Sequence, residues 1–307
     1  MDHKLYLKDP GIFKNKNFYY TSGKLVTDSV TLKRLNKLKP PPAWTSVWYA
    51  SNKDCHIQVY GTDTSGKKQY ILSENYINES RSEKYKNMKN FTRKINSFKK
   101  RIKLKNEIIN RENLICLLFN LLIDTHIRVG NEIYAETNKT YGLTTLRQKH
   151  LKFEDNVFKF IFTGKSKIKH TILVPSEYNN FMEKLQLTHK NKLLFWYRDP
   201  EMKHITSDDL NNFLKDNMGK EYTCKDFRTY SANVLFIKYF LKNSKRNGNV
   251  KKIILKSIDE TAYQLGHTRS ISRKSYISNN LIDYCLDSFE SAASFSPKEL
   301  LCKVWTV

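Results

Sequence analysis

Apolar residues recur at helical spacing in the middle of the chain and predict two long helices. The first is marked by five positions spaced three or four apart: Met88, Phe91, Ile95, Phe98 and Ile102. Lysines and arginines crowd the positions between them, so this helix is amphipathic with a basic outer face. Such a face either contacts phosphate groups or is simply solvated. The nearly apolar run from Leu114 to Ile123 predicts a second, buried helix.

Elsewhere the pattern changes to alternation and predicts strands. Near the N-terminus, alternating residues on both sides of Thr62-Asp-Thr-Ser-Gly66 predict a hairpin. Its return strand places Lys67 and Gln69 on one face and Lys68 and Tyr70 on the other. Lysine for phosphate and glutamine for a base edge suit a strand that reads DNA, and a solvated sheet edge is the alternative.

Three further strands are expected near 146–153, 157–163 and 169–175, with a turn at Gly164-Lys165-Ser166-Lys167. The C-terminal part is expected to be helical. Thr206 and Thr223 mark helix starts, and Thr223 with Asp226 has the spacing of a capping box. A helix over about 250–265 closes at Gly266 and presents His267.

The polar segment 75–85 is the expected boundary between two domains, 1–78 and 79–307. The stiff Lys39-Pro-Pro-Pro-Ala-Trp44 segment cannot lie inside a helix. The chain is long enough for one large domain or for two.

Charge narrows the class of partner. The 54 lysines and arginines against 30 acidic residues give a net charge of +24. Such an excess favours a nucleic-acid backbone, with a lysine-rich proteome or a membrane surface as alternatives. Five cysteines, odd in number and without a C-x-x-C pair, argue against both a disulfide framework and a zinc site. Neither a signal peptide nor a run of ~20 apolar residues is present, so the protein is expected to be intracellular, not secreted, and not in a membrane.

Candidate chemistry concentrates between Gln264 and Tyr276. A histidine and a tyrosine at fixed separation beside cations suit attack on a phosphodiester, with the tyrosine as nucleophile. By itself a tyrosine on a helix is usually core or surface filler. Arg128 follows the buried helix, where Gly130 is suited to end it. This arginine can reach a pocket or neutralise the helix C-terminus. Lys225 and Arg228 are three apart and share a helix face.

Together with several other segments, and in the order in which they occur along the chain, these residues resemble the type IB DNA topoisomerases in their small poxvirus-like, giant-virus and bacterial forms. The matching segments are Lys39-Pro-Pro-Pro-Ala-Trp44, Gly61-Thr-Asp-Thr-Ser-Gly-Lys-Lys-Gln-Tyr70, Ile127-Arg-Val-Gly-Asn-Glu-Ile-Tyr134, Tyr141-Gly-Leu-Thr-Thr-Leu146, Gly164-Lys165, Lys225-Asp-Phe-Arg-Thr-Tyr230 and Leu265-Gly-His267 through Tyr276. They span nearly the whole chain.

The resemblance implies an α+β fold of the tyrosine recombinase and topoisomerase IB type. A small strand-rich N-terminal domain and a larger, mainly helical catalytic domain with a three-stranded antiparallel sheet would form a C-shaped clamp around DNA. Supercoils would be relaxed by transient cleavage of one strand through a 3′-phosphotyrosyl intermediate, swivelling and religation, without ATP.

The implied catalytic residues are Tyr276 as nucleophile, Lys165 as general acid, and Arg128, Arg228 and His267 on the phosphate oxygens. The implied DNA-binding residues are Lys67, Lys68, Gln69, Tyr70, Tyr134 and Lys225. Lys67-Lys68 stands where the family commonly has arginines.

No cofactor is expected to be required; a divalent cation can stimulate but is not essential, and no metal site is expected. Double-stranded DNA is the expected partner of a monomer that needs no obligate protein partner, in the cytoplasm or, if viral, in the virion or replication site. One alternative is a tyrosine recombinase or integrase, which typically carries histidine where this chain has Lys225 and lacks the N-terminal motifs. The other is a non-catalytic DNA-binding relative, although no catalytic position is vacant here.

Overall fold

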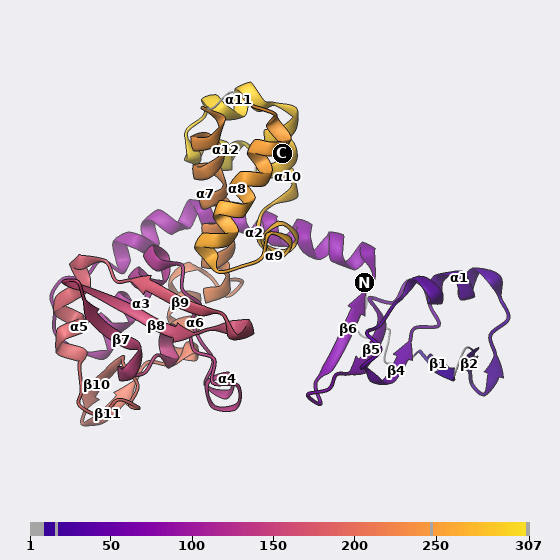
Figure 1. Ribbon diagram of the computed structural model, residues 1–307, viewed down its shortest axis with the longest axis horizontal. Coiled ribbons are helices and arrows are strands. Elements are labelled where there is room, and N and C mark those ends of the chain that lie inside the picture. The colour runs from indigo at the N-terminus through magenta and orange to yellow at the C-terminus, as the bar shows by residue number, and fades with distance from the viewer. Residues whose placement is uncertain (1–8, 16–17, 246–247, 305–307) are drawn as a thin grey trace. The chain divides into compact units, whose positions relative to one another are not determined.

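The computed structural model describes residues 9–15, 18–245 and 248–304. It divides into two compact units, Met1–Lys84 and Tyr85–Val307 (Figure 1). The expected division at 78/79 stays a prediction. The expected polar link at 75–85 is wrong as a description of the local structure, because these residues are already helical.

Unit 1 is built on one six-stranded sheet. Its strands follow the order β3-β2-β1-β4-β5-β6, and each neighbouring pair is antiparallel. The strands are β1 (Ile12–Asn15), β2 (Phe18–Thr21), β3 (Lys24–Leu25), β4 (Thr45–Tyr49), β5 (Ile57–Thr62) and β6 (Lys68–Leu72). Helix α1 (Ser29–Lys37) begins at Asp28, whose carboxylate accepts from the Thr31 amide. Leu35 of this helix is fully buried with Ile12, Tyr49 and Val59.

The predicted hairpin around Thr62–Gly66 is confirmed as β5–β6. Gly61 pairs with Gln69, and Tyr60 pairs with Tyr70. Asp63 fixes the turn, because its carboxylate accepts from the Ser65 and Lys67 amides at 2.9 and 3.0 Å. The hairpin tip therefore has a defined shape.

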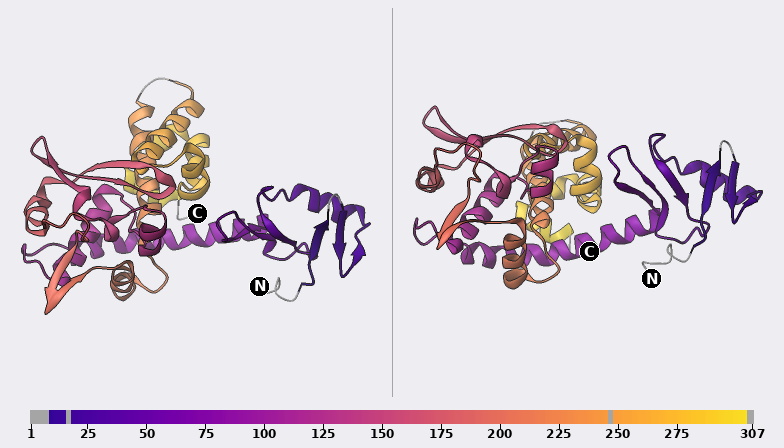
Figure 2. Two further views of the ribbon diagram at one scale, coloured as in Figure 1. Left: turned by 60° about the horizontal axis from the view of Figure 1, so that its bottom comes forward. Right: turned by 90° about the horizontal axis from the view of Figure 1, so that it is seen from below.

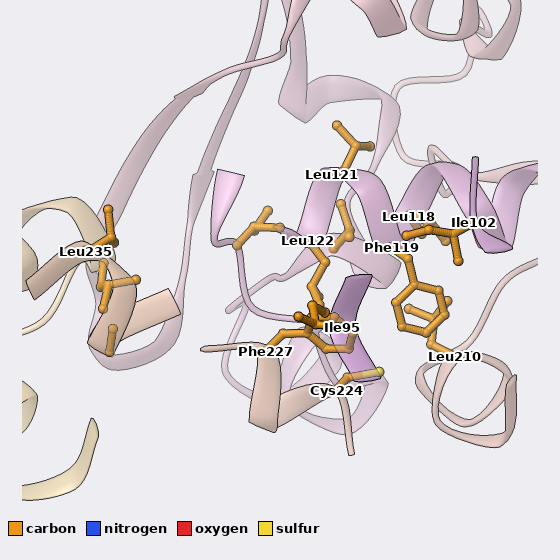
Figure 3. Packing of buried hydrophobic residues seen from close by; sticks show 14 of the residues in the cluster. Ile95, Ile102, Leu118, Phe119, Leu121, Leu122, Leu210, Cys224, Phe227 and Leu235 are labelled. Atoms are coloured by element: carbon orange, nitrogen blue, oxygen red, sulfur yellow. The ribbon is translucent and has the colours of Figure 1, made fainter. Parts of the chain in front are cut away.

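The helices of unit 2 enclose one large hydrophobic core. They are α2 (Glu74–Arg101, which starts in unit 1), α3 (Arg111–Thr125), α4 (Glu132–Thr137), α5 (Asn179–Leu185), α6 (Ser207–Met218), α7 (Cys224–Ser244), α8 (Val250–Leu265), α9 (Arg269–Ile271), α10 (Asn279–Asp287), α11 (Phe289–Ser294) and α12 (Pro297–Val304). Both predicted central helices are confirmed. The apolar face of α2 packs on α3 and α7, where Phe98 contacts Phe119 and Phe227. Figure 3 shows Phe119 and Phe227 together with Ile95 and Ile102 of this core.

Two small sheets complete unit 2 (Figure 2). The predicted three-stranded sheet consists of β7 (Leu151–Glu154), β8 (Val157–Thr163) and β9 (Lys169–Leu173), all antiparallel. Its first strand was expected to start near 146, but 148–150 form a 3₁₀ turn and β7 begins at Leu151. The hairpin of β10 (Trp196–Asp199) and β11 (Glu201–His204) was not predicted.

The helix preceding Arg128 ends earlier than predicted. Its cap is His126, which adopts the left-handed conformation with φ 56° and ψ 19°. Gly130 has a positive φ of 109°, but it lies in the following loop. Arg128 is therefore part of a loop and does not terminate the helix.

The predicted helix starts at Thr206 and Thr223 are confirmed. Asp226 accepts from the Thr223 amide at 2.8 Å, and Asp209 accepts from the Thr206 amide at 2.9 Å. The four cysteines whose side chains are described are free, and Cys302 lies outside that set. Within the described ranges, no helix is both long and apolar enough to traverse a bilayer.

Candidate active site

The 264–276 segment folds as a helix end followed by two short turns. Helix α8 ends at Gly266 in the left-handed conformation, with φ 59° and ψ 47°, and presents His267 as predicted. Residues 269–271 then form the short helix α9. Tyr276 is the last residue of a π-helical turn that begins at Ser272. π-Turns of this kind are frequent at functional sites.

Arg228 is the structural centre of the site. It lies on the second turn of α7 and is only 8% exposed. Its guanidinium donates to the carbonyl oxygens of His126 and Leu265, which terminate α3 and α8. It also donates from Nη2 and Nε to Nε2 of His267, at 2.9 and 3.3 Å. One planar fork of donors therefore joins three segments that are distant in sequence.

Arg128 is held through its backbone. Its carbonyl accepts from the Leu143 amide at 2.8 Å, within the Tyr141–Leu146 segment. Gly142 permits this close approach, because a Cβ there would lie 2.6 Å from the Arg128 oxygen. Burial lowers the pKa of Arg128, and the nearby Tyr276 side chain, which accepts a hydrogen bond from it, opposes that shift.

Tyr276 lies between the histidine and the two arginines. Its ring stacks on His267, with 4.4 Å between centroids and 27° between planes. Its hydroxyl also accepts from Arg228. The phenolic oxygen is therefore placed where two cations can stabilise negative charge on it and on an attacked phosphate.

Lys165 completes the group from the tip of the β8–β9 hairpin. Residues 165–167 form a tight turn, closed by the Gly164 amide donating to the Ile168 carbonyl at 2.8 Å. The lysine is exposed, yet its charge is close enough to lower the pKa of His267. The structure therefore brings all five predicted catalytic residues together, although their roles stay predictions.

His267 is neutral in this arrangement. Burial first, and then the charges of Arg228 and Arg128, lower its pKa to about 3. Burial and the charge of Arg128 likewise lower the pKa of Arg228. Because an arginine can only donate, Nε2 of His267 must accept, and Nδ1 then carries the proton toward the Ser272 hydroxyl at 3.4 Å.

Sequence reasoning missed the residues that hold the tyrosine backbone. The Asn233 amide donates from Nδ2 to the Tyr276 carbonyl at 3.0 Å and accepts from the Ser278 amide at 2.9 Å. The hydroxyl of Tyr85 donates to the same Tyr276 carbonyl at 3.3 Å. Asn233 is fully buried one and a half turns after Arg228 on α7. A buried asparagine in an otherwise apolar stretch of helix was the available signal.

The predicted DNA-binding residues occupy exposed places in both units. In unit 2, Lys225 lies one turn before Arg228, and Tyr134 on α4 is 47% exposed. In unit 1, Lys67 directly precedes β6 and is exposed. The ammonium of Lys68 lies 3.8 Å from the centroid of the Tyr60 ring.

The remaining two unit 1 residues are partly constrained. Gln69 donates from Nε2 to Asp63 at 2.8 Å, so one of its two amide protons is already used. Tyr70 is 46% exposed. Exposed cations, amides and aromatic rings are the groups that contact nucleic acids, and contact by these particular residues stays a prediction.

The described residues contain no group of three or more histidines, cysteines or carboxylates placed to hold a metal ion. The charges at the site come from side chains. A tyrosine hydroxyl, one buried and one partly buried arginine, a neutral histidine and an exposed lysine are groups suited to enzymes that transfer a phosphodiester to and from tyrosine.

Comparison with known proteins identifies the family within that class. Residues 73–292 match the catalytic core of eukaryotic DNA topoisomerase I, and residues 17–63 match the N-terminal domain of bacterial DNA topoisomerase IB. The chain belongs to the type IB DNA topoisomerase family.

Viral proteins are among its relatives. The chain is 33% identical to DNA topoisomerase 1B of Acanthamoeba polyphaga mimivirus, with 93% of this chain and 89% of that protein covered. It is 26% identical to DNA topoisomerase 1B of vaccinia virus, with 92% and 90% covered. A solved site-specific recombinase, XerH bound to a palindromic difH substrate, gives a TM-score of 0.38 at 15% identity over 75% of this chain and 59% of that one.

Proposed function

We propose that the five clustered residues cleave and reseal one strand of duplex DNA. The observation that carries this proposal is the position of the Tyr276 hydroxyl, which accepts from both Arg128 and Arg228 while its ring stacks on His267. The chain is a type IB DNA topoisomerase, and it relaxes supercoils by transient cleavage of a single strand.

The first step exchanges one phosphodiester for another. The phenolic oxygen of Tyr276 attacks phosphorus and forms a P–O bond, and its proton passes to solvent. The P–O5′ bond breaks, and the departing 5′ oxygen takes a proton from the Lys165 ammonium. The product is a 3′-phosphotyrosyl link with a free 5′-hydroxyl, which reverses the step after the nicked strand has swivelled.

Arg128 and Arg228 stabilise the charge that gathers on the nonbridging oxygens during both steps. His267 can join them only with a proton on Nε2. That atom now accepts from Arg228, so a phosphate oxygen that takes over the arginine donors must be accompanied by a shift of the His267 proton from Nδ1 to Nε2. Because each exchange makes one phosphodiester for each that it breaks, the reaction needs no ATP. The family is generally metal-independent, and we propose that no cofactor is required here, while a divalent cation can stimulate.

We further propose that the two units clamp duplex DNA, with Lys67, Lys68, Gln69 and Tyr70 contacting it from unit 1, and Tyr134 and Lys225 from unit 2. The net charge of +24 supports this arrangement. The enzyme is proposed to act as a monomer without a protein partner, inside the cell or at a viral replication site.

The decisive test is covalent capture of DNA. Wild-type protein is incubated with an end-labelled DNA duplex in the presence of a chelator and without ATP. The covalent protein–DNA adduct is then resolved on a denaturing gel. Tyr276→Phe should form none, whereas Tyr263→Phe should behave as wild type, because Tyr263 is a surface tyrosine of the same unit with 87% exposure. Adduct formation by Tyr276→Phe would refute the assignment. Relaxation of a plasmid that lacks any recombination partner separates this function from a recombinase.

A further inference from the structure

His170 occupies a position that none of the five proposed roles explains. It lies on β9, directly across from Phe162 on β8, and its ring stacks on that phenylalanine with 5.1 Å between centroids and 21° between planes. The strand pair next to the Lys165 turn is Thr163 with Lys169, and the pair after it is Phe162 with His170. The base of the lysine hairpin therefore carries a histidine on β9.

The ring of His170 fits between two motif glycines. A Cβ built on Gly164 would lie 2.7 Å from its Cδ2 atom, and one built on Gly266 would lie 2.5 Å from its Cε1 atom. Gly164 precedes the lysine, and Gly266 precedes His267. The same ring thus packs on the backbone that supports two catalytic side chains from distant segments.

The two glycines are required for different reasons. Gly266 has a φ of 59°, where a side chain is strained in any surroundings. Gly164 has an ordinary φ of −97° and ψ of −168°, which alanine adopts readily. Close approach of the His170 ring is therefore the reason that a glycine precedes Lys165.

The ring is also a neutral neighbour of the cationic cluster. Burial and the charges of Arg128 and Arg228 lower the pKa of His170. A neutral, flat ring can fill the space beside two arginines without adding to their repulsion.

We infer that His170 is a positioning residue that holds the Lys165 hairpin against the end of α8, so that Lys165, the proton donor, and His267 lie beside the same phosphate. This inference rests on the proposed cleavage reaction. It assigns His170 no contact with DNA. Its effect is carried by packing on Gly164 and Gly266.

The test uses the chemistry of the leaving group. Single-turnover cleavage is measured on a duplex with the normal 5′ oxygen and on a matched duplex with sulfur at that bridging position. A thiolate leaves without protonation, because thiols are far more acidic than alcohols. His170→Ala should slow cleavage of the oxygen duplex ~10–100-fold, as expected for a misplaced catalytic group, and should slow the sulfur duplex at least tenfold less. Lys165→Ala provides the reference pattern.

A wild-type rate for His170→Ala, or an equal loss on both duplexes, would overturn the inference. Failure of the wild-type enzyme to cleave either duplex would instead refute the proposed function. His150→Ala is the matched control, since His150 is a buried histidine of the same unit, 6% exposed, that packs on Tyr141. It should not change the ratio of oxygen to sulfur rates.

A second pair of variants keeps the test valid if His170→Ala does not fold. Gly164→Ala introduces the clash with the ring and should show the same dependence on the leaving group. In the double variant Gly164→Ala/His170→Ala the clash disappears, so its rate should exceed the product of the two single effects by more than about threefold. Effects that simply multiply would show that the ring does not pack on Gly164 in the active enzyme.

Discussion

Asn233 offers the sharpest separation of nucleophile placement from general stability. Asn233→Ala removes the amide that accepts from Ser278 and donates to the Tyr276 carbonyl. The Ser278 residue is 1% exposed, so its amide is left buried without a partner at a cost of about 1–3 kcal/mol. The Tyr276 carbonyl keeps the Tyr85 hydroxyl at 3.3 Å. With the small void that the substitution leaves, we expect Asn233→Ala to lower the free energy of unfolding by about 2–3 kcal/mol in total.

The same substitution should slow cleavage ~10–100-fold, because a displacement near 1 Å at a reacting group costs about that much. Asn243→Ala is the control. Asn243 lies on the same helix, is 3% exposed, and donates to Ser257 and Glu260 at 3.2 and 2.6 Å. Urea melts should show similar destabilisation of both variants, while single-turnover cleavage should be slowed only by Asn233→Ala. Equal rates in the two variants would refute the positioning argument.

Three further outcomes are expected. Arg228→Lys should lower the cleavage rate ~10²–10³-fold while the affinity for DNA changes little. The reason is that one ammonium group cannot replace the guanidinium that holds His126, Leu265 and His267. A loss of affinity large enough to account for the slower rate would contradict this. Folding stability should fall as the pH drops from about 6.5 to 5, because burial lowers the pKa values of His126 and His150 to about 4 and that of His267 to about 3, so only the unfolded chain takes up these protons. Each ring contributes at most about 2 kcal/mol at pH 5, reduced to about 1 kcal/mol by solvent screening, and urea melts that are flat over this range would exclude the effect. DNA binding should weaken ~10³–10⁵-fold between 50 and 200 mM salt if ~6–10 phosphates are contacted, and Lys225→Ala should reduce the slope of that dependence in filter-binding titrations.

The sequence was most informative where local rules determine the structure. The helix over 250–265 and its end at Gly266 were predicted because a left-handed cap strongly favours glycine. Capping at Thr223 was predicted for the same kind of local reason. The β8–β9 hairpin follows from a run of strand formers and a turn. The family motifs then indicated which side chains share a site.

Features that depend on contacts between distant segments were not predictable in this way. The carbonyl of His126, at the end of α3, accepts from the guanidinium of Arg228, a residue about a hundred positions away in the chain. The segment 75–85 is polar, and its helical conformation continues that of the amphipathic helix that follows. Asn233 and His170 gain their importance only from the Tyr276 backbone and the motif glycines against which they lie.

The site is suited to bind an anion, because neither of its two guanidinium groups is paired with a carboxylate in the described part of the chain. In the described part of the chain, no carboxylate pairs with Arg128 or Arg228, and backbone carbonyls and the Tyr276 hydroxyl satisfy Arg228 instead. Neutral acceptors orient a guanidinium without cancelling its charge, whereas a carboxylate would compete with phosphate. Burial first, and then repulsion by Arg128, lower the pKa of Arg228, and both cost folding stability. An incoming phosphodiester relieves that repulsion, and the relief is greatest in the transition state, where more negative charge has accumulated. The same unpaired cations that cost folding stability therefore supply the preference for the transition state.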